Sequence, residues 1–435
     1  MNRETIKYLA NRANVRPVDG SFCRSRIYQH AIVIPAMAEA SLLPNTIASL
    51  AENNKTSLEK VLIVVVVNNR SADKMPGVSG LSGIVQDNQR TLQWLRSQSH
   101  SLSLQLGWID ASSPGHELPA SGGVGMARKI GCDSALALLF ESQNKDISGF
   151  QPESSVIFNL DADTLVQQNY LDAAQELIKS RTDGGTIQFE HQPAASTTAQ
   201  NAIDLYELFL HYYLEGLIWA KSPYAFHTVG STMLCTAQGY TRAGGMPGKR
   251  QAGEDFYFLQ QLAKTGGVTN ITCTTVHPSA RISHRVPFGT GLRMAQALEQ
   301  GVDTNETYDP RSFVALRELL YTIKHNLNTP PQEILARLTC PQTVQFLKNK
   351  SFIKIFLGFQ KQFCTAEKRL AAFTQWFDAL ATFRLVNHLS TSVWPKMNVL
   401  DAWRTLLQLE GMPHRWKNER ELLEWQRSRS LAFHH

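Results

Sequence analysis

The sequence predicts an α/β protein with a mostly parallel central sheet flanked by helices, followed by a mainly helical C-terminal region. After residue 30, short apolar segments alternate with segments of helical periodicity, and a strand, helix, strand succession implies a right-handed parallel unit. The apolar segment "KVLIVVVVNN" at 60–69 is a β-branched run typical of a strand buried on both faces. From about residue 292 onward the chain is almost entirely helix-like.

The predicted elements follow in order along the chain. Residues 1–29 are polar and basic and look like an extension with one short helix. Strands are then expected at 31–35, 60–69, 102–111 and 154–164, and helices at 43–53, 88–98 and 125–142, with a Ser/Gly/Asp-rich loop at 71–90. A long amphipathic stretch at 198–221 and a helix beginning near Glu254 come next. With a boundary near residue 291, the expected domains are an N-terminal extension (1–29), an α/β domain (30–291) and a helical region (292–435).

Composition limits the classes of protein to consider. The chain has 435 residues, 43% of them hydrophobic and 18% charged, which excludes a disordered polyelectrolyte. The net charge of +6 suits anionic partners such as nucleotides, and no nucleic-acid partner is expected. Six scattered cysteines indicate reduced thiols and a cytoplasmic protein. Neither a signal peptide nor a run of roughly 18 apolar residues is evident, so secretion and membrane spanning are not expected.

The last predicted parallel strand ends on two aspartates, in "VIFNLDADT". Asp161 and Asp163 lie where open α/β sheets bind ligands, at the carboxyl edge. Two carboxylates spaced in this way can chelate a hard divalent cation through oxygen. The alternative is a solvated pair of turn aspartates, since this spacing is common by chance.

Two further motifs carry candidate chemistry. In "GEDFYF", Glu254 and Asp255 begin an apolar helix. They either stabilise the helix N-terminus by interacting with its dipole or provide a base next to the flexible, basic loop that precedes them. In "SGGVGMARKIG", a Gly-rich turn leads into a helix with Arg128 and Lys129. Backbone amides and cations at such a helix start can cradle a diphosphate, although helical arginine and lysine are more often solvated.

The order of these motifs resembles the family 2 glycosyltransferases with the GT-A fold, over roughly residues 30–290. "IPAMAEASLLPNTIASL" is similar to the family's opening P-x-x-N-E motif, and "VVVVNNRSAD" takes the place of its VVDDGSTD. "GGVGMARKIG", "NLDADT", "GGMPGKRQAGEDFYFLQQLAKTGG" and "SARISHR" are similar to its G-x-x-x-A-R-N-x-G, LDADD, GGF…EDxxLxxRL and DARVYHR motifs. The implied architecture is a Rossmann-like, mostly parallel sheet flanked by helices.

The resemblance implies a metal-dependent, inverting transfer of a sugar from a nucleoside diphosphate sugar to the hydroxyl of a glycan or lipid-linked saccharide, as in polysaccharide biosynthesis. Mn²⁺ or Mg²⁺ would be held by Asp163, with Asp161 at the ribose or the metal's waters. His284 would be a further metal ligand, and His277 is its competitor. Asp255 would be the general base and Glu254 would orient the loop or contact the acceptor. The residues implied to bind the nucleotide sugar are Pro35, Ala36, Glu39, Asn68, Arg128 and Asp161.

The chain departs from the family at two places. Asn68 and Asn69 replace the acid that reads the nucleobase, and an amide that both accepts and donates matches N3–H and O4 of uracil. UDP is therefore favoured over GDP as the nucleotide. The family's Asn-Glu is Ala38-Glu39 here, which keeps the carboxylate and loses the amide contact.

Other interpretations remain open. The basic, aromatic C-terminal region either approaches the inner face of a membrane or packs as helices with a solvated basic face, and the second is favoured. A sugar-1-phosphate nucleotidyltransferase is an alternative enzyme, but the Gly-rich triphosphate loop that such enzymes carry is not seen after the first strand. A non-catalytic protein that binds sugar nucleotides or glycans is the other alternative, and it would have no need of the base at Asp255.

Overall fold

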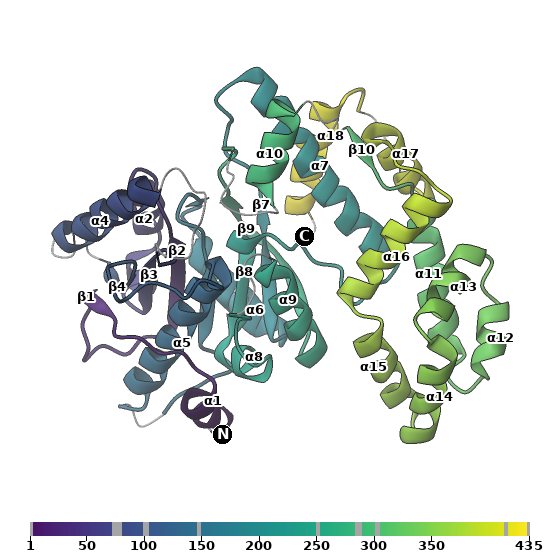
Figure 1. The fold of residues 1–435 in the computed structure, drawn as a ribbon, viewed down its shortest axis with the longest axis horizontal. Coiled ribbons are helices and arrows are strands. Elements are labelled where there is room, and N and C mark those ends of the chain that lie inside the picture. The colour runs from purple at the N-terminus through teal and green to yellow at the C-terminus, as the bar shows by residue number, and fades with distance from the viewer. Residues whose placement is uncertain are drawn as a thin grey trace. The chain divides into compact units, whose positions relative to one another are not determined.

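The computed structural model describes residues 3–71, 81–98, 104–145, 149–248, 253–282, 289–300, 305–412 and 416–432 (Figure 1). The chain forms two compact units. The first consists of Met1–Thr197, Thr228–Ala295 and Ser430–His435, and the second of Thr198–His227 and Gln296–Arg429. Among the helices in the described ranges, none is both long and apolar enough to span a bilayer. All six cysteines are free thiols.

The first unit is built on one large sheet. Within the described residues its strand order is β1-β4-β3-β2-β5-β8-β7-β9-β6. The strands are β1 (Asp19–Ser21), β2 (His30–Ala36), β3 (Val61–Asn68), β4 (Gln105–Ala111), β5 (Val156–Asn159), β6 (Leu165–Val166), β7 (Gly184–Phe189), β8 (Met233–Thr236) and β9 (Val268–His277). Strands β2, β3, β4, β5, β7 and β9 run in one direction, and β1, β6 and β8 run in the other. The predicted α/β class with a mostly parallel sheet is confirmed.

The helices of this unit alternate with its strands. They are α1 (Arg3–Asn11), α2 (Leu43–Ala51), α3 (Lys55–Leu58), α4 (Leu81–Gln98), α5 (Val124–Gln143), α6 (Ala173–Ser180), α8 (Ala237–Arg242) and α9 (Glu254–Thr265), with 3₁₀ turns η2 (Tyr170–Asp172) and η3 (Gly230–Thr232). Helix α10 (Thr290–Glu299) follows β9 along the chain. The helix predicted to begin near Glu254 begins at that residue.

Strand β3 and helix α5 are both largely buried in the first unit. Every residue of β3 is buried, as expected for a β-branched strand covered on both faces. Helix α5 lies along β2 and β3 (Figure 1) and approaches them closely at Gly131. A Cβ atom at Gly131 would lie 2.3 Å from Val33 Cγ1 and 2.9 Å from Val66 Cγ2. The glycine therefore sets the depth at which α5, and with it Arg128, sits on the sheet.

The N-terminal segment predicted as an extension contributes to the first unit. Strand β1 pairs with β4, and helix α1 carries the buried Tyr8. The hydroxyl groups of Tyr8 and Tyr240 each donate to Asp133 Oδ1 at 2.7 Å, and Lys129 Nζ donates to Asp133 Oδ2 at 2.9 Å. This buried carboxylate of α5 thus ties α1 and α8 to the helix that carries Arg128.

The predicted loop at 71–90 is wrong in its second half. Residues 72–80 lie outside the described part of the chain, and α4 begins at Leu81, seven residues before the predicted start of the helix at 88. Asn88 and Leu92 are buried on this helix. Gly83 lies in the first turn of α4, where a glycine is less costly than in the middle of a helix.

The second unit is almost entirely helical, as predicted for the C-terminal region. Its elements are α7 (Thr197–Trp219), β10 (Glu306–Thr307), α11 (Arg311–His325), α12 (Pro331–Ala336), α13 (Pro341–Asn349), α14 (Phe352–Gln362), α15 (Ala366–Trp376), α16 (Ala379–Ser392), β11 (Met397–Asn398), α17 (Val399–Leu409) and α18 (Glu419–Ala432). The apolar stripe predicted at 198–221 lies on α7, whose Leu208 and Tyr212 pack in one core with Phe313 and Trp403. Arg427 Nε of α18 also donates to the buried Glu207 of α7, at 2.8 Å.

We expect Gly131→Ala to lower the free energy of unfolding by about 1 to 3 kcal/mol, because the added methyl group overpacks α5 against Val33 and Val66. The matched control is Gly83→Ala in α4, where a Cβ atom meets nothing within 4 Å. Its better helix propensity should leave stability equal or slightly higher. Urea denaturation followed by circular dichroism measures both variants, and equal stability of Gly131→Ala and the wild type would contradict the packing argument.

Candidate active site

The candidate site lies in the first unit, at the carboxyl end of the parallel strands. Asp161 and Asp163 follow β5 in a turn whose backbone is held from two sides. Thr46 Oγ1 donates to the carbonyl of Ala162 at 2.9 Å, and Gln192 Nε2 donates to the carbonyl of Asp163 at 2.8 Å. The turn therefore presents its two carboxylates from a fixed backbone at the edge where such sheets bind ligands.

Arg128 is a buried cation shared by two carboxylates. The residue is 2% exposed, and its guanidinium donates from Nη2 to Asp161 Oδ1 at 2.6 Å and from Nε to Glu254 Oε1 at 3.1 Å. A third bond runs from Nη1 to the carbonyl of Gly230 at 3.2 Å. Burial alone would lower the pKa of Arg128, but the carboxylates of Asp161 and Glu254 outweigh burial and raise it. The cluster joins the turn after β5 to the start of α9.

This geometry favours an indirect role for Arg128, which the resemblance implies to contact a diphosphate. Its side chain is 3% exposed and already donates to three protein groups, so it orients Asp161 and Glu254. Gly230 makes room for it, because a Cβ atom there would lie 2.5 Å from Arg128 Nη2. Asp161, with a side chain 36% exposed, is the member of the cluster that faces solvent.

Asp255 is electrostatically part of this cluster. Burial, followed by repulsion from Glu254, raises the pKa of its carboxyl from the ordinary 3.8 to about 7. A hydrogen bond from the Phe256 amide and the charge of Arg128 act in the opposite direction and are outweighed. A carboxyl group that titrates near neutral pH beside a fixed cation has the property required of a general base.

A second ion cluster involves a residue that the sequence analysis did not single out. Arg281 Nη2 contacts the carboxylate of Glu39 and lies 2.8 Å from Asp163 Oδ2. Burial would lower the pKa of Arg281, but Asp163 and Glu39 raise it. Glu39 and Asp163, two residues predicted for the site, thus lie side by side with an arginine between them.

The predicted nucleobase residues lie at the ends of β2 and β3. Asn68 Nδ2 donates to the carbonyls of Ala36 and Val66, each at 3.1 Å, so only the carbonyl oxygen of this amide remains for a base. The expectation that Asn68 both donates to and accepts from uracil is therefore corrected. Asn88, from α4, donates to the backbone carbonyl of Asn68 and to the side-chain oxygen of Asn69. Pro35, the residue before Ala36, lies within β2 beside β3.

Of the two histidines considered as metal ligands, only one is described. His284 lies outside the described residues. His277 ends β9 opposite Leu165, close to the turn of Asp163. Its Nδ1 lies 3.1 Å from the carbonyl of Glu190, and its own carbonyl accepts a bond from Gln192.

The described donor atoms fit a divalent cation only with help from a ligand. Within the described ranges, no group of three or more His, Cys, Asp or Glu side chains is arranged to hold a metal ion. Glu39 and Asp163 do bring carboxylate oxygens to one nitrogen of Arg281. Mg²⁺ is commonly held by one or two carboxylates together with substrate phosphates and water. These carboxylates thus fit a divalent cation whose remaining ligands come from a bound diphosphate and water.

Three residues of the site were missed by the sequence analysis: Gly230, Arg281 and Asn88. Arg281 stands in the quoted motif "SARISHR", three residues before His284, so a signal for it was present. Gly230 and Asn88 carry no local signal, because the first is required by the close approach of Arg128 and the second by a tertiary hydrogen bond.

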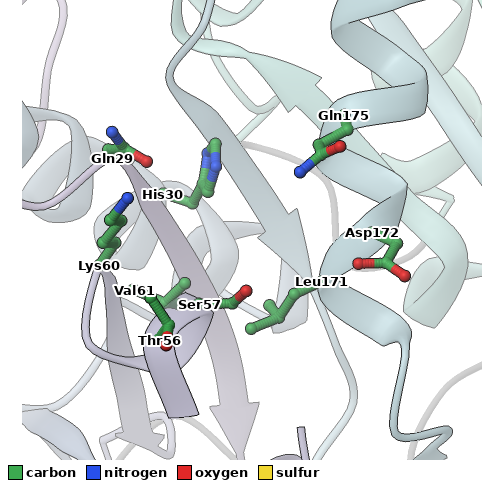
Figure 2. Close-up of a pocket in the computed structure, with 9 residues that line it drawn as sticks. All are labelled: Gln29, His30, Thr56, Ser57, Lys60, Val61, Leu171, Asp172 and Gln175. Atoms are coloured by element: carbon green, nitrogen blue, oxygen red, sulfur yellow. The ribbon is translucent and has the colours of Figure 1, made fainter. Parts of the chain in front are cut away.

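A separate small cavity lies at the opposite, amino end of β2 and β3. It has a volume of about 120 Å³ and is lined by Gln29, His30, Thr56, Ser57, Lys60, Val61, Leu171, Asp172 and Gln175 (Figure 2). His30 Nδ1 accepts a bond from the amide of Val156 at 3.2 Å. Burial, aided by Lys60, lowers the pKa of His30 to about 4, so this imidazole is neutral at physiological pH. None of the clustered carboxylates described above lines this cavity.

Comparisons with known proteins place few limits on the function. No protein-family model matches the chain, and no curated protein matches it. Among solved structures, S. aureus TarS 1–349 in complex with UDP-GlcNAc shares 11% identity over 89% of this chain and 94% of that chain, with a TM-score of 0.36. Mannosyltransferase PcManGT from Pyrobaculum calidifontis, in complex with GDP-Man and Mn²⁺, shares 14% identity over 99% of this chain and 93% of that chain, with a TM-score of 0.34.

The raised pKa of Asp255 predicts a specific pH dependence of stability. A carboxyl with a native pKa of about 7 and an unfolded value near 4 stabilises the fold in its protonated form below about pH 4, and this contribution is lost as pH rises through 7. The free energy of unfolding of Asp255→Asn, minus that of the wild type, should therefore increase between pH 4 and 8. Urea denaturation at a series of pH values measures it.

Asp110→Asn is the matched control for this experiment. Burial would raise the pKa of Asp110, but hydrogen bonds from Ser113 and Ser112 outweigh it and hold the pKa below the ordinary value. Asp110 is therefore ionised in both states above about pH 5, and its difference curve should be flat there. A flat curve for Asp255→Asn as well would show that the pKa of Asp255 is not raised in the folded protein, and would contradict its role as a poised base.

Proposed function

We propose that this protein is a glycosyltransferase that moves a sugar from a nucleoside diphosphate sugar to an acceptor hydroxyl with inversion at the anomeric carbon. The observation that carries the proposal is the cluster at the carboxyl edge of the sheet. There, Arg128 fixes Asp161 and Glu254 beside Asp255, whose pKa is raised to about 7. A protein that only binds a sugar nucleotide has no need of a poised carboxyl group next to the binding edge.

Each residue has a role that follows from its contacts. Asp161, the exposed member of the cluster, contacts the ribose or the waters around the diphosphate. Asp255 takes the proton from the acceptor hydroxyl as that oxygen attacks the anomeric carbon, on the face opposite the leaving diphosphate. Glu254, held by Arg128, positions the start of α9 and so places Asp255 relative to the donor. Pro35, Ala36 and Asn68 line the nucleoside end of the donor at β2 and β3.

We include Mn²⁺ or Mg²⁺ in the proposal, with Asp163 as a ligand. The chemistry that the cation supplies when bound is neutralisation of the negative charge that grows on the β-phosphate as the diphosphate leaves. The protein's part is to present Asp163 from a turn whose backbone is held by Thr46 and Gln192. His284 remains a proposed further ligand.

The substrates are proposed only by class. The acceptor is a glycan or a lipid-linked saccharide, which would bind beside Asp255. UDP is the first nucleotide to test, because the free carbonyl oxygen of Asn68 can accept from N3–H of uracil. Guanine offers comparable N–H donors, so calorimetry with UDP and GDP decides between them.

Turnover of nucleotide sugars tests the proposal. With Mn²⁺ and a panel of nucleotide sugars, the wild type should release nucleoside diphosphate, and kcat should rise with pH to a plateau above about 7, as Asp255 loses its proton. Asp255→Asn should lower kcat by roughly 100-fold or more while the affinity for the nucleoside diphosphate changes little. Asp163→Ala should instead weaken binding of the nucleoside diphosphate in the presence of Mn²⁺.

The control for these variants is Asp172→Asn. Asp172 is an exposed carboxylate beside the cavity at the amino end of the sheet, and this variant should turn over like the wild type. Release that persists in Asp255→Asn but is lost in Asp172→Asn would contradict the proposed site.

A further inference from the structure

The contact of Arg281 with Glu39 and Asp163 is unusual in how its charge is distributed. Glu39 comes from the loop after β2, Asp163 from the turn after β5, and Arg281 from the segment after β9. Both carboxylates contact the same atom, Nη2 of Arg281. One positive charge therefore faces two negative charges on two separate elements, and the carboxylates converge on a single point.

The guanidinium is not in its best hydrogen-bonding arrangement there. Arginine pairs most strongly with a carboxylate through two parallel N–H bonds, whereas both of these contacts use one nitrogen. Nε of Arg281 is buried and has no hydrogen-bond acceptor among the described residues. A buried donor without a partner costs free energy. The side chain is 32% exposed, so it has a path out of this position, while Glu39 at 6% is held in place.

We propose that a divalent cation binds between Glu39 and Asp163, at the point now taken by Arg281 Nη2, and that Arg281 competes with it for this position. The inference rests on the proposed function, since it names the protein ligands of the cation that accompanies the diphosphate. Glu39 becomes a cation ligand, a role given neither by the aspartate pair nor by the resemblance.

The competition has a physical basis. Two carboxylate oxygens at one point suit a hard divalent cation better than a guanidinium, because the cation carries twice the charge and prefers oxygen ligands. Displaced from this position, Arg281 can pair with phosphate oxygens next to the cation. The larger the fraction of molecules in which Arg281 occupies the position, the weaker the apparent affinity for the cation.

The test is Mn²⁺ binding to the metal-free, full-length protein, measured as the loss of the free Mn²⁺ signal in electron paramagnetic resonance without any nucleotide. Arg281→Gln removes the competing charge and should lower the Kd for Mn²⁺ by about tenfold, within the usual range of coupling between two ligands. Glu39→Gln removes a ligand and should raise the Kd by about tenfold or more. Arg26→Gln, which breaks the surface pair with Glu59, is the control and should bind Mn²⁺ like the wild type.

Thermal unfolding provides the second readout. Without metal, Arg281→Gln should melt at a lower temperature than the wild type, because two carboxylates lose their shared partner. Added Mn²⁺ should raise its Tm more than it raises that of the wild type. If Arg281→Gln does not fold, Arg281→Lys and Glu39→Gln still decide the matter, because the shorter lysine should compete less and tighten Mn²⁺ binding.

Mn²⁺ affinities that are equal in the wild type, Arg281→Gln and Glu39→Gln, or no Mn²⁺ binding at all, would overturn the inference. Turnover of nucleotide sugars, measured on the same samples, separates this failure from that of the proposed function. If Mn²⁺ binds more tightly to Arg281→Gln and more weakly to Glu39→Gln but no nucleotide sugar is turned over, the cation site is supported and the proposed transferase activity is contradicted. If nucleotide sugars are turned over but the Mn²⁺ affinities of the wild type and both variants are equal, the cation site between Glu39 and Asp163 is contradicted and the proposed transferase activity is supported.

Discussion

The structure of the site depends on one interaction, the burial of the Arg128 guanidinium between Asp161 and Glu254. Taking a guanidinium out of water costs several kcal/mol unless carboxylates and hydrogen bonds compensate it, and both are present here. Because the two carboxylates come from different elements, the ion pair fixes the turn after β5 relative to the first turn of α9. Asp255 is therefore placed beside this cluster, where burial and then the charge of Glu254 raise its pKa.

The surrounding fold serves the same constraint. Gly131 lets α5 lie close on β2 and β3, and Asp133 ties that helix to α1 and α8 through two tyrosines. Gly230 leaves the space that the guanidinium fills. In the second cluster, the guanidinium of Arg281 is more exposed and contacts both carboxylates through one nitrogen, so a ligand can displace it. One arginine is thus structural for the site, and the other is suited to give way to a ligand.

The sequence predicted those elements whose formation depends on residues close together in the chain. The β-branched run of β3, the aspartates after β5, the start of α9 at Glu254 and the apolar stripe of α7 were all legible because periodicity and helix signals determine them. Strand β1, with the sequence "DGS", has no apolar signal and exists because it pairs with β4. The partner of Asp163 and the hydrogen bonds of Asn68 were not predicted, because Arg281 lies 118 positions from Asp163 in the sequence and the Asn68 amide donates to backbone carbonyls, one of them 32 positions away.

A crystal structure of the protein with Mn²⁺ and a non-hydrolysable nucleotide sugar tests the proposed site most directly. We expect the diphosphate at the carboxyl edge of the sheet, beside Asp161 and Asp163. We also expect the carboxylate of Asp255 on the side of the anomeric carbon away from the phosphates, with Arg128 still paired to Asp161 and Glu254. A nucleotide bound elsewhere, such as in the cavity at the amino end beside His30 and Lys60, would contradict the proposed site.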